Sequence, residues 1–543
     1  MNILGIHSGL NNGEHDVGAA LICDGRIVSV PEEERFSKIK MSKGLLPIRA
    51  IRECLRQAKI SMADVDLVVS PNESKPEYAE RISDFLRHYF GHSPKVELIN
   101  HQLAHLASAF FVSGLDKSMV ISWDHSGDGL STAIARGNRD GLGLMETRAN
   151  SNSLGLFFRM MTQFLGFKAN EGEYKVMGLA PYGQPSFDLS DVLRPDDHEG
   201  FLLNQDYFRR SPLLVNGDEP NYSAKLTELL GEPRRTGDEV TQRHRNIAAS
   251  AQLALEECAI SLVESTHKKT GLDALCLAGG VALNCSANMR IAQLPFLRRL
   301  FVQPSASDRG LPLGCALYGA HQAGERFTEL ANVFLCGPEY SQDEIEETLN
   351  LSGYRYKETS DPAEYAASQI AQGKIVGWFQ GRSEFGPRAL GHRSILADPR
   401  SASMKDRINA RVKFREEFRP FAPAVTEASA KSYFSMGIME RSPFMTVALL
   451  VNDVKQKDIQ AVTHINGTAR VQTVSPGDDA LFHKLISDFG KVSGVPVVLN
   501  TSFNVRGQPI VESPYDAIAT FAGSGIDVLV IGNQVVEKKV GAG

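Results

Sequence analysis

The sequence lacks the features of exported, membrane-embedded and zinc-cluster proteins. Its first residues, Met1–Leu10, have no basic segment followed by a long apolar run, so we expect no signal peptide. No uninterrupted apolar stretch reaches about 18 residues, so we expect no membrane span. The seven cysteines form no C-x-x-C pair, and most lie in apolar segments. They are predicted to be buried free thiols of a cytoplasmic protein.

The chain also lacks an excess of positive charge. Its formal net charge of −6 disfavours nucleic acid as the main partner, although a local basic site is compatible with it. The chain is long, with 543 residues of ordinary globular composition. A single hydrophobic core rarely serves a chain of that length, so we predict two domains, residues 1–332 and 333–543.

A strand–turn–strand pattern occurs twice in the first domain. Residues Asn2–Ile6 predict a strand, and Gly18–Val30 predict a hairpin that turns at Asp24–Gly25. The pattern restarts with a buried strand at Met119–Asp124 and a polar turn at Ser126–Gly129. Such a restart indicates a duplication. It resembles the actin, sugar-kinase and heat-shock-ATPase superfold, in which two related α/β lobes bind ligands between their polar turns.

Helices and strands alternate through the rest of the chain. Periodicity predicts helices at 47–58, 77–90, 100–112, 247–266, from 281, 311–324 and 362–373, and further strands at 65–70, 96–99, 273–280, 300–304 and 374–380. The polar region 185–237 is predicted to be an insertion or lid.

Two histidines, His101 and His105, stand four residues apart at the head of an apolar run. On a helix they would project from neighbouring turns of one face, about 6 Å apart at Cβ, which suits two ligands of one metal ion. The alternative is that they are surface or core histidines. Acidic ligands elsewhere in the chain would decide between the two.

Two aspartates meet that requirement. Asp124 ends a buried strand and Asp308 follows another, and ligands usually bind at the carboxyl ends of strands in α/β domains. With the histidines they form a mixed nitrogen and oxygen set, which suits Fe²⁺, Mn²⁺ or Zn²⁺ better than Ca²⁺. Asp308 has an alternative as the N-cap of a helix near Gly310. Asp128 is interpreted as a turn residue.

The segment Leu277–Asn284 is a predicted strand, two glycines and a helix. Gly279 and Gly280 would let the backbone approach a nucleotide closely, with helix N–H groups facing the anion. Packing between strand and helix is the alternative. Glu173 and Lys175 flank a glycine-rich turn, so they are candidates for phosphate contact or members of a solvated loop.

The densest charge signal lies between Arg382 and Arg419. These 38 residues hold ten Lys or Arg against five Asp or Glu, in a chain whose total charge is negative. The arginines stand among Gly, Phe and Pro, unlike a solvated helix face. Arginine forks bind phosphate oxygens through bidentate bonds, so we predict a phosphate site. Few aromatics interleave with the charges, which disfavours a nucleic-acid groove.

Six motifs occur together and in order: HQLAH, NEGEYKVMGLAPYG, LAGGVALNC, GPRALGHRSILADPR, KFREEFRPFAP and NTSFNVRGQPIV. In these the chain resembles the NodU/CmcH/TobZ family of O-carbamoyltransferases over almost its whole length. One departure is Gln102, where members often have a second adjacent histidine. That position is not an expected ligand, so the departure weakens the metal assignment only modestly.

For the C-terminal domain, the resemblance implies a YrdC-like twisted α/β sheet with a basic concave face. This domain would convert carbamoyl phosphate and ATP, with Mg²⁺, into carbamoyladenylate, phosphate and pyrophosphate. Its cationic side chains would offset the repulsion between two polyanions, and an asparagine would orient the carbamoyl amide. The residues implied are Arg388, Lys413, Arg419, Arg470, Asn504 and Arg506.

For the N-terminal domain, the resemblance implies a fold like that of the universal tRNA threonylcarbamoyl-transfer ATPase. A divalent ion, Fe²⁺ before Mn²⁺ or Zn²⁺, would be held by His101, His105, Asp124 and Asp308. His15 would be the base that activates an acceptor hydroxyl, oriented by Asp16, although His15 also fits a simple turn residue. The nucleotide would contact Lys175, Gly279, Gly280 and Asn284.

The sequence thus predicts an ATP-dependent O-carbamoyltransferase acting on a small natural product, with neither nucleic acid nor membrane as partner, as a monomer or homodimer. A tRNA threonylcarbamoyl-transfer enzyme is a second interpretation, which the acidic charge disfavours. A nucleotide-binding regulator without chemistry is a third. It would not need His15, the metal histidines and the arginines together. Region 185–237 and the domain cleft are expected to recognise the acceptor.

Overall fold

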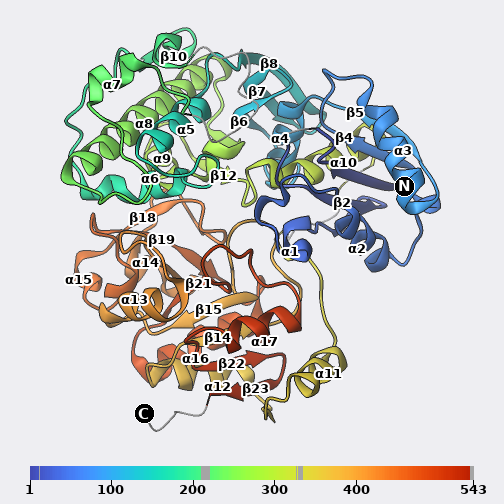
Figure 1. Cartoon of the computed structure of the whole chain (residues 1–543), viewed down its shortest axis with the longest axis vertical. Coiled ribbons are helices and arrows are strands. Elements are labelled where there is room, and N and C mark those ends of the chain that lie inside the picture. The colour runs from blue at the N-terminus through green and yellow to red at the C-terminus, as the bar shows by residue number, and fades with distance from the viewer. Residues whose placement is uncertain (12, 210–219, 326, 328–333, 539–543) are drawn as a thin grey trace.

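The computed structural model describes residues 1–11, 13–209, 220–325, 327 and 334–538. Figure 1 shows the N-terminal part, from blue to yellow-green, above the C-terminal part, from yellow to red. The predicted boundary at residue 332 lies outside the described residues. Helix α10 (Leu311–Gln322) precedes it, and helix α11 (Gln342–Ser352) follows it.

The first sheet has the strand order β3-β2-β1-β4-β5. Its strands are β1 (Asn2–His7), β2 (Gly18–Cys23), β3 (Arg26–Ser29), β4 (Leu67–Ser70) and β5 (Lys95–Leu98). The first three are antiparallel neighbours, whereas β1, β4 and β5 run parallel. Asp24 and Gly25 both have positive φ at the predicted hairpin turn, as a tight two-residue turn requires.

The second sheet repeats this arrangement with the order β12-β11-β6-β7-β8. Its strands are β6 (Ser118–Gly127), β7 (Leu130–Asn138), β8 (Gly141–Ala149), β11 (Ala274–Ala278) and β12 (Arg299–Val302). Again the first three in sequence are antiparallel, and β6, β11 and β12 are parallel. Two sheets with the same order and directions are what the predicted duplication requires.

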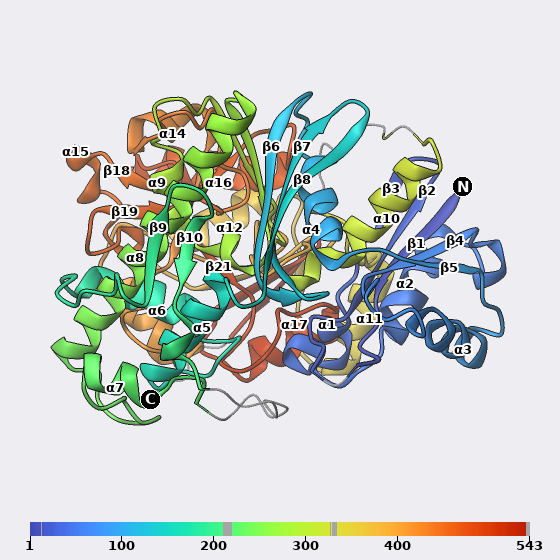
Figure 2. The same ribbon diagram turned by 90° about the horizontal axis from the view of Figure 1, so that it is seen from above.

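Two helices lie between the sheets and contact each other. Helix α4 (His101–Phe110) packs on β6, β7 and β11, and α10 packs on β1, β2 and β4 (Figure 2). Their approach is close, because a Cβ on Gly314 would come within 1.9 Å of the Ala104 carbonyl oxygen. Outer helices α2 (Ile48–Ala58) and α3 (Tyr78–Phe90) cover the first sheet, and α5 (Leu154–Phe164) and α8 (Gln242–Thr270) cover the second.

Where the structure describes it, region 185–237 packs on the N-terminal part of the chain. Strands β9 (Leu193–Asp196) and β10 (Gly200–Leu203) form a hairpin against α8. Phe201 and, from helix α7 (Ala224–Leu230), Leu226 are buried in the largest hydrophobic core. Apolar burial therefore fixes these elements to the N-terminal core. Residues 210–219 lie outside the described part of the chain.

The helix predicted from Val281 begins later. A 3-10 turn spans Gly280–Leu283, and helix α9 (Cys285–Ile291) follows. Asn284 separates them because its side chain accepts a hydrogen bond from the Ala287 N–H and caps α9.

The C-terminal part is built on one mixed sheet with the order β13-β23-β22-β14-β15-β21-β16-β20. The strands are β13 (Lys357–Glu358), β14 (Val376–Phe379), β15 (Arg393–Ala397), β16 (Ala422–Thr426), β20 (Gln472–Val474), β21 (Val497–Ser502), β22 (Val528–Ile531) and β23 (Gln534–Glu537). Helices α12 (Pro362–Ala371) and α16 (Ala480–Ser493) bury the apolar side of this sheet. The mixed α/β class is confirmed, while the YrdC identity stays a prediction.

Six of the seven cysteines are buried, as expected, and Cys23 is partly buried. Across the described ranges no helix is long and apolar enough to cross a membrane.

Candidate functional site

The four predicted metal ligands converge. One ligand atom from each of His101, His105, Asp124 and Asp308 lies within 4.8 Å of the others. The His101 Nε2 atom is 3.4 Å from Asp124 and 3.5 Å from Asp308, and the His105 Nε2 atom is 3.7 and 3.5 Å from the same carboxylates. The group joins the start of α4, strand β6 and the turn before α10.

The cap alternative for Asp308 is excluded. Ser307 is the N-cap of the 3-10 turn Asp308–Gly310, and Asp308 makes no capping bond there. Its carboxylate instead faces both histidines. The surface alternative for His101 and His105 is also excluded, because both are buried against these carboxylates.

The donor set fits a divalent ion. His105 is fully buried, and neither of its ring nitrogens has a hydrogen-bond partner in the described residues. Burial works against a charged His101, yet Asp308 and Asp124 raise its pKa to about 10. Two buried carboxylates thus favour positive charge beside them, which protonated histidines or a bound metal ion would supply. Two imidazole and two carboxylate donors suit Fe²⁺, Mn²⁺ or Zn²⁺.

Several neighbours hold these ligands in place. A Cβ on Gly127 would come 2.1 Å from the His101 ring, so only glycine leaves that ring its position. The Gly280 N–H donates to Asp124 at 3.0 Å. Asp128, a turn residue with φ of 50° as predicted, accepts from the His101 N–H at 2.8 Å. Gln102 is bonded to Ser122, which explains why it is no ligand.

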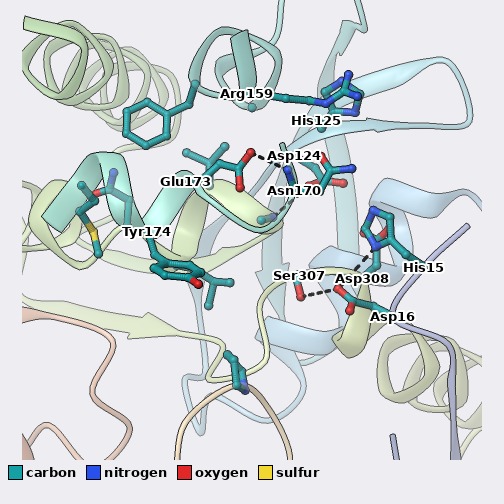
Figure 3. A pocket seen from close by; sticks show the side chains of 18 of the residues that line it. His15, Asp16, Asp124, His125, Arg159, Asn170, Glu173, Tyr174, Ser307 and Asp308 are labelled. Atoms are coloured by element: carbon teal, nitrogen blue, oxygen red, sulfur yellow. Dashed lines mark hydrogen bonds and ion pairs between the residues drawn. The ribbon is translucent and has the colours of Figure 1, made fainter. Parts of the chain in front are cut away.

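His15 and Asp16 lie at the first polar turn, close to the metal group (Figure 3). The His15 Nδ1 atom is 3.5 Å from Asp16, whose other oxygen is 3.1 Å from Arg309 Nε. Burial opposes the charge of His15, but Asp16 raises its pKa to about 9. Arg309 also pairs with Glu34 at 3.0 Å. Sequence reasoning missed Arg309, although it adjoins Asp308.

These residues open into a cavity of about 250 Å³. Its polar lining includes the candidate base and both aspartates of the metal group. It also includes Arg159 of α5, Asn170 in the turn before α6 (Glu173–Leu179), Glu173 and Tyr174 of α6, and His125 beside Arg159 (Figure 3). Glu173 is on a helix, so the solvated-loop alternative does not apply to it.

The predicted nucleotide residues are only partly together. Gly280 and Asn284 line this cavity. Gly279 has φ of 84° and packs on the Trp123 backbone, and it does not line the cavity. Its role is to form the turn that carries Gly280. Lys175 points away, with its Nζ 2.8 Å from Glu416 of the C-terminal part.

A second cavity, of about 300 Å³, holds the C-terminal candidates. Arg388, Arg419, Arg470 and Asn504 line it, together with Arg415, which the sequence did not single out. The other two candidates lie outside its lining. Lys413 is buried behind Asn504 and donates to its side-chain oxygen at 2.7 Å, and Arg506 bonds to the Phe414 carbonyl.

The arginines of this cavity repel one another. Burial and the neighbouring Arg470 lower the pKa of Arg388 to about 9, and burial and Arg419 lower that of Arg415 to about 9. Both stay charged at neutral pH. Arg388 has no ion pair in the described part of the chain, and such a cluster of arginines suits an anionic ligand.

Glu384 holds the loop that carries Arg388. One of its oxygens accepts from the backbone N–H groups of Leu390, His392 and Arg393 at 2.8, 2.8 and 3.0 Å. These bonds close the loop 384–393 and fix where Arg388 stands.

The two cavities share part of their lining, including Asp16, Tyr174, Met177 and Arg388. The metal group and the arginine cluster therefore face one continuous space. No described residue of 185–237 lines either cavity, so the role of that region in acceptor recognition stays a prediction.

The described residues thus form an α/β protein in which a buried His/Asp group and an arginine cluster line adjoining cavities. Comparison with known proteins gives its class. Residues 75–317 match the model "Carbamoyltransferase N-terminus", and residues 367–538 match "Carbamoyltransferase C-terminus". The chain therefore belongs to the carbamoyltransferase family, and it is an enzyme of that family.

Its relatives include proteins of similar length. "Nodulation protein NolNO" of Sinorhizobium fredii (strain NBRC 101917 / NGR234) is 38% identical over 559 residues, covering 97% of this chain and 80% of that one. "3'-hydroxymethylcephem-O-carbamoyltransferase" of Amycolatopsis lactamdurans is 34% identical over 269 residues, covering 49% of each. "Nodulation protein U" of the same Sinorhizobium strain is 25% identical and covers 91% of this chain and 93% of that one.

Proposed function

We propose that this carbamoyltransferase is ATP-dependent and acts in two steps at two sites. It forms carbamoyladenylate from carbamoyl phosphate and ATP, and then transfers the carbamoyl group to a hydroxyl of a small natural product. The observation that carries the proposal is the shared lining of the two cavities, with Arg388 on both.

The first step belongs to the arginine cavity. Carbamoyl phosphate and ATP are polyanions, and Arg388, Arg415, Arg419 and Arg470 offset their mutual repulsion. Asn504, held by Lys413, orients the carbamoyl amide. One water is consumed, because carbamoyl phosphate, ATP and water balance carbamoyladenylate, phosphate and pyrophosphate. The fold of this domain is YrdC-like in our proposal.

The second step belongs to the cavity beside His15. Its Nδ1 atom faces Asp16, and its other ring nitrogen has no partner among the described residues, so it is free to take the acceptor's proton. The hydroxyl oxygen then bonds to the carbamoyl carbon as the bond to AMP breaks. AMP leaves with Gly280 and Asn284 beside it.

His101, His105, Asp124 and Asp308 would hold the divalent ion, Fe²⁺ in our proposal, which when bound supplies positive charge beside the adenylate phosphate. Asp308 and Asp124 are among the causes that raise the pKa of His15. A bound cation would offset the negative charge of these two aspartates. The pKa of His15 would then fall, which favours its neutral imidazole, the form that acts as a base.

The acceptor class comes from the relatives. The cephem O-carbamoyltransferase is named for a hydroxymethyl acceptor, which supports a hydroxyl on a small natural product here as well.

The test uses the whole protein with carbamoyl phosphate, ATP and Mg²⁺ but no acceptor, followed by ³¹P NMR. We expect pyrophosphate, phosphate and a new adenylate resonance, and none of these changes when carbamoyl phosphate is omitted. Absence of pyrophosphate in the complete mixture would rule out the proposed first step.

A further inference from the structure

A third, small cavity adjoins the arginine cavity at Arg470. It has a volume of about 50 Å³ and shares Met177, Pro420 and Arg470 with the arginine cavity. A site needs roughly 10–15 Å³ for each water-sized atom. The space therefore takes about four such atoms, which is the size of one tetrahedral oxyanion and too small for a nucleotide.

Its charged lining is entirely basic. Lys405 of helix α13 (Ser403–Ile408), Arg470 of strand β19 (Thr468–Arg470) and His464 line it, and no Asp or Glu does so within the described chain. Lys405 forms no ion pair with a described residue. The Arg470 Nε atom is buried without a hydrogen-bond partner. Two cations that face the same small cavity stabilise an anion there.

The hydrogen bonds around His464 decide what kind of anion fits. The Thr468 hydroxyl donates to Asn466 at 2.8 Å, so its oxygen must accept the 3.0 Å bond from His464 Nδ1. The proton is then on Nδ1 of a neutral ring. Burial, with Arg470 and Lys405 nearby, lowers the pKa of His464 to about 3 and so keeps the ring neutral. The His464 Nε2 atom is buried without a partner and presents a lone pair.

We propose that this cavity is a binding site for hydrogenphosphate, which donates its P–OH to His464 Nε2 while Lys405 and Arg470 bind its other oxygens. Sulfate has the same shape and charge but no proton to donate at neutral pH, so it leaves Nε2 unsatisfied. That the site receives the phosphate released beside it rests on the proposed function, whereas the binding itself does not.

Crystals of the full chain soaked separately in arsenate and in selenate test the geometry, since arsenate keeps an O–H and selenate does not. We expect an anomalous peak between Lys405, His464 and Arg470 with arsenate, and a weak peak or none with selenate. A peak confined to the arginine cavity would overturn the site. Equal peaks from both anions would overturn the role of His464.

Calorimetry in solution gives the second test. Lys405→Met should weaken the phosphate-selective binding by about tenfold, the loss of one charge-assisted bond. His464→Phe should reduce the preference of phosphate over sulfate. Lys457→Met, an exposed lysine of the same part of the chain, is the matched control. Phosphate binding equal to that of the control in both variants would refute the site, provided their melting temperatures match the wild type. If wild-type protein makes no pyrophosphate, the proposed function fails and these binding tests still stand.

Discussion

The Nε atom of Arg309 lies 3.1 Å from the Asp16 carboxylate, and Arg309 directly follows the metal-ligand candidate Asp308. The Arg309 guanidinium therefore connects Asp16, the partner of His15, with the segment that carries the metal-ligand candidate Asp308. It also pairs with Glu34 at 3.0 Å, so it balances two buried carboxylates.

Arg309→Met should destabilise the fold by about 3–5 kcal/mol, the usual cost of leaving buried charges unpaired. The difference in unfolding free energy between wild type and variant should become smaller as the pH falls from 7 to 5. Burial raises the pKa of Glu34, and Arg309 is the largest influence that lowers it, so the variant's folded state takes up protons more readily than the unfolded state. Denaturant unfolding at both pH values measures this. A variant as stable as wild type at pH 7 would contradict the balancing role.

Gly127→Ala should displace the His101 ring, because the new Cβ would meet it at 2.1 Å. We expect metal affinity to fall about 10–100-fold, which is the usual effect of removing a residue that positions a metal ligand. Pyrophosphate formation should continue. Gly143→Ala is the control, since its Cβ would have only one neighbour, at 3.7 Å. Metal titration of both variants gives the readout. Equal affinity would show that His101 does not bind the ion.

Arg388→Met should abolish carbamoyladenylate formation. It should also make the unliganded protein more stable by about 1 kcal/mol, because a half-buried charge that neighbouring arginines repel is replaced by an apolar side chain. Thermal unfolding with and without pyrophosphate checks this. The wild type should gain more stability from the ligand than the variant. A variant that melts lower than wild type without ligand would contradict mutual repulsion among the arginines.

The sequence was informative where a residue's own neighbours determine its place. His101 and His105 share a helix face, Asp124 lies on a strand and Asp308 follows one, so their meeting could be predicted. Arg309 could not, because its partners Asp16 and Glu34 lie almost 300 positions away along the chain.

Among the basic residues, sequence alone did not separate Arg388 and Arg415, which line the cavity, from Lys413 and Arg506, which do not. Their side-chain directions depend on how the loops fold. The predicted phosphate contact of Lys175 could not be judged from sequence for a related reason. Its partner in the structure, Glu416, comes from the C-terminal part of the chain. Region 185–237 looked polar, yet a few apolar residues such as Phe201 were enough to bind it to the core.

The most direct test of two sites with separate tasks compares both half-reactions in one variant, His101→Ala with His105→Ala. With carbamoyl phosphate and ATP, it should release pyrophosphate at a rate near that of wild type, while transferring no carbamoyl group to an acceptor hydroxyl. Equal loss of pyrophosphate release and of transfer, in a variant that remains folded, would contradict the division of the reaction between the two sites.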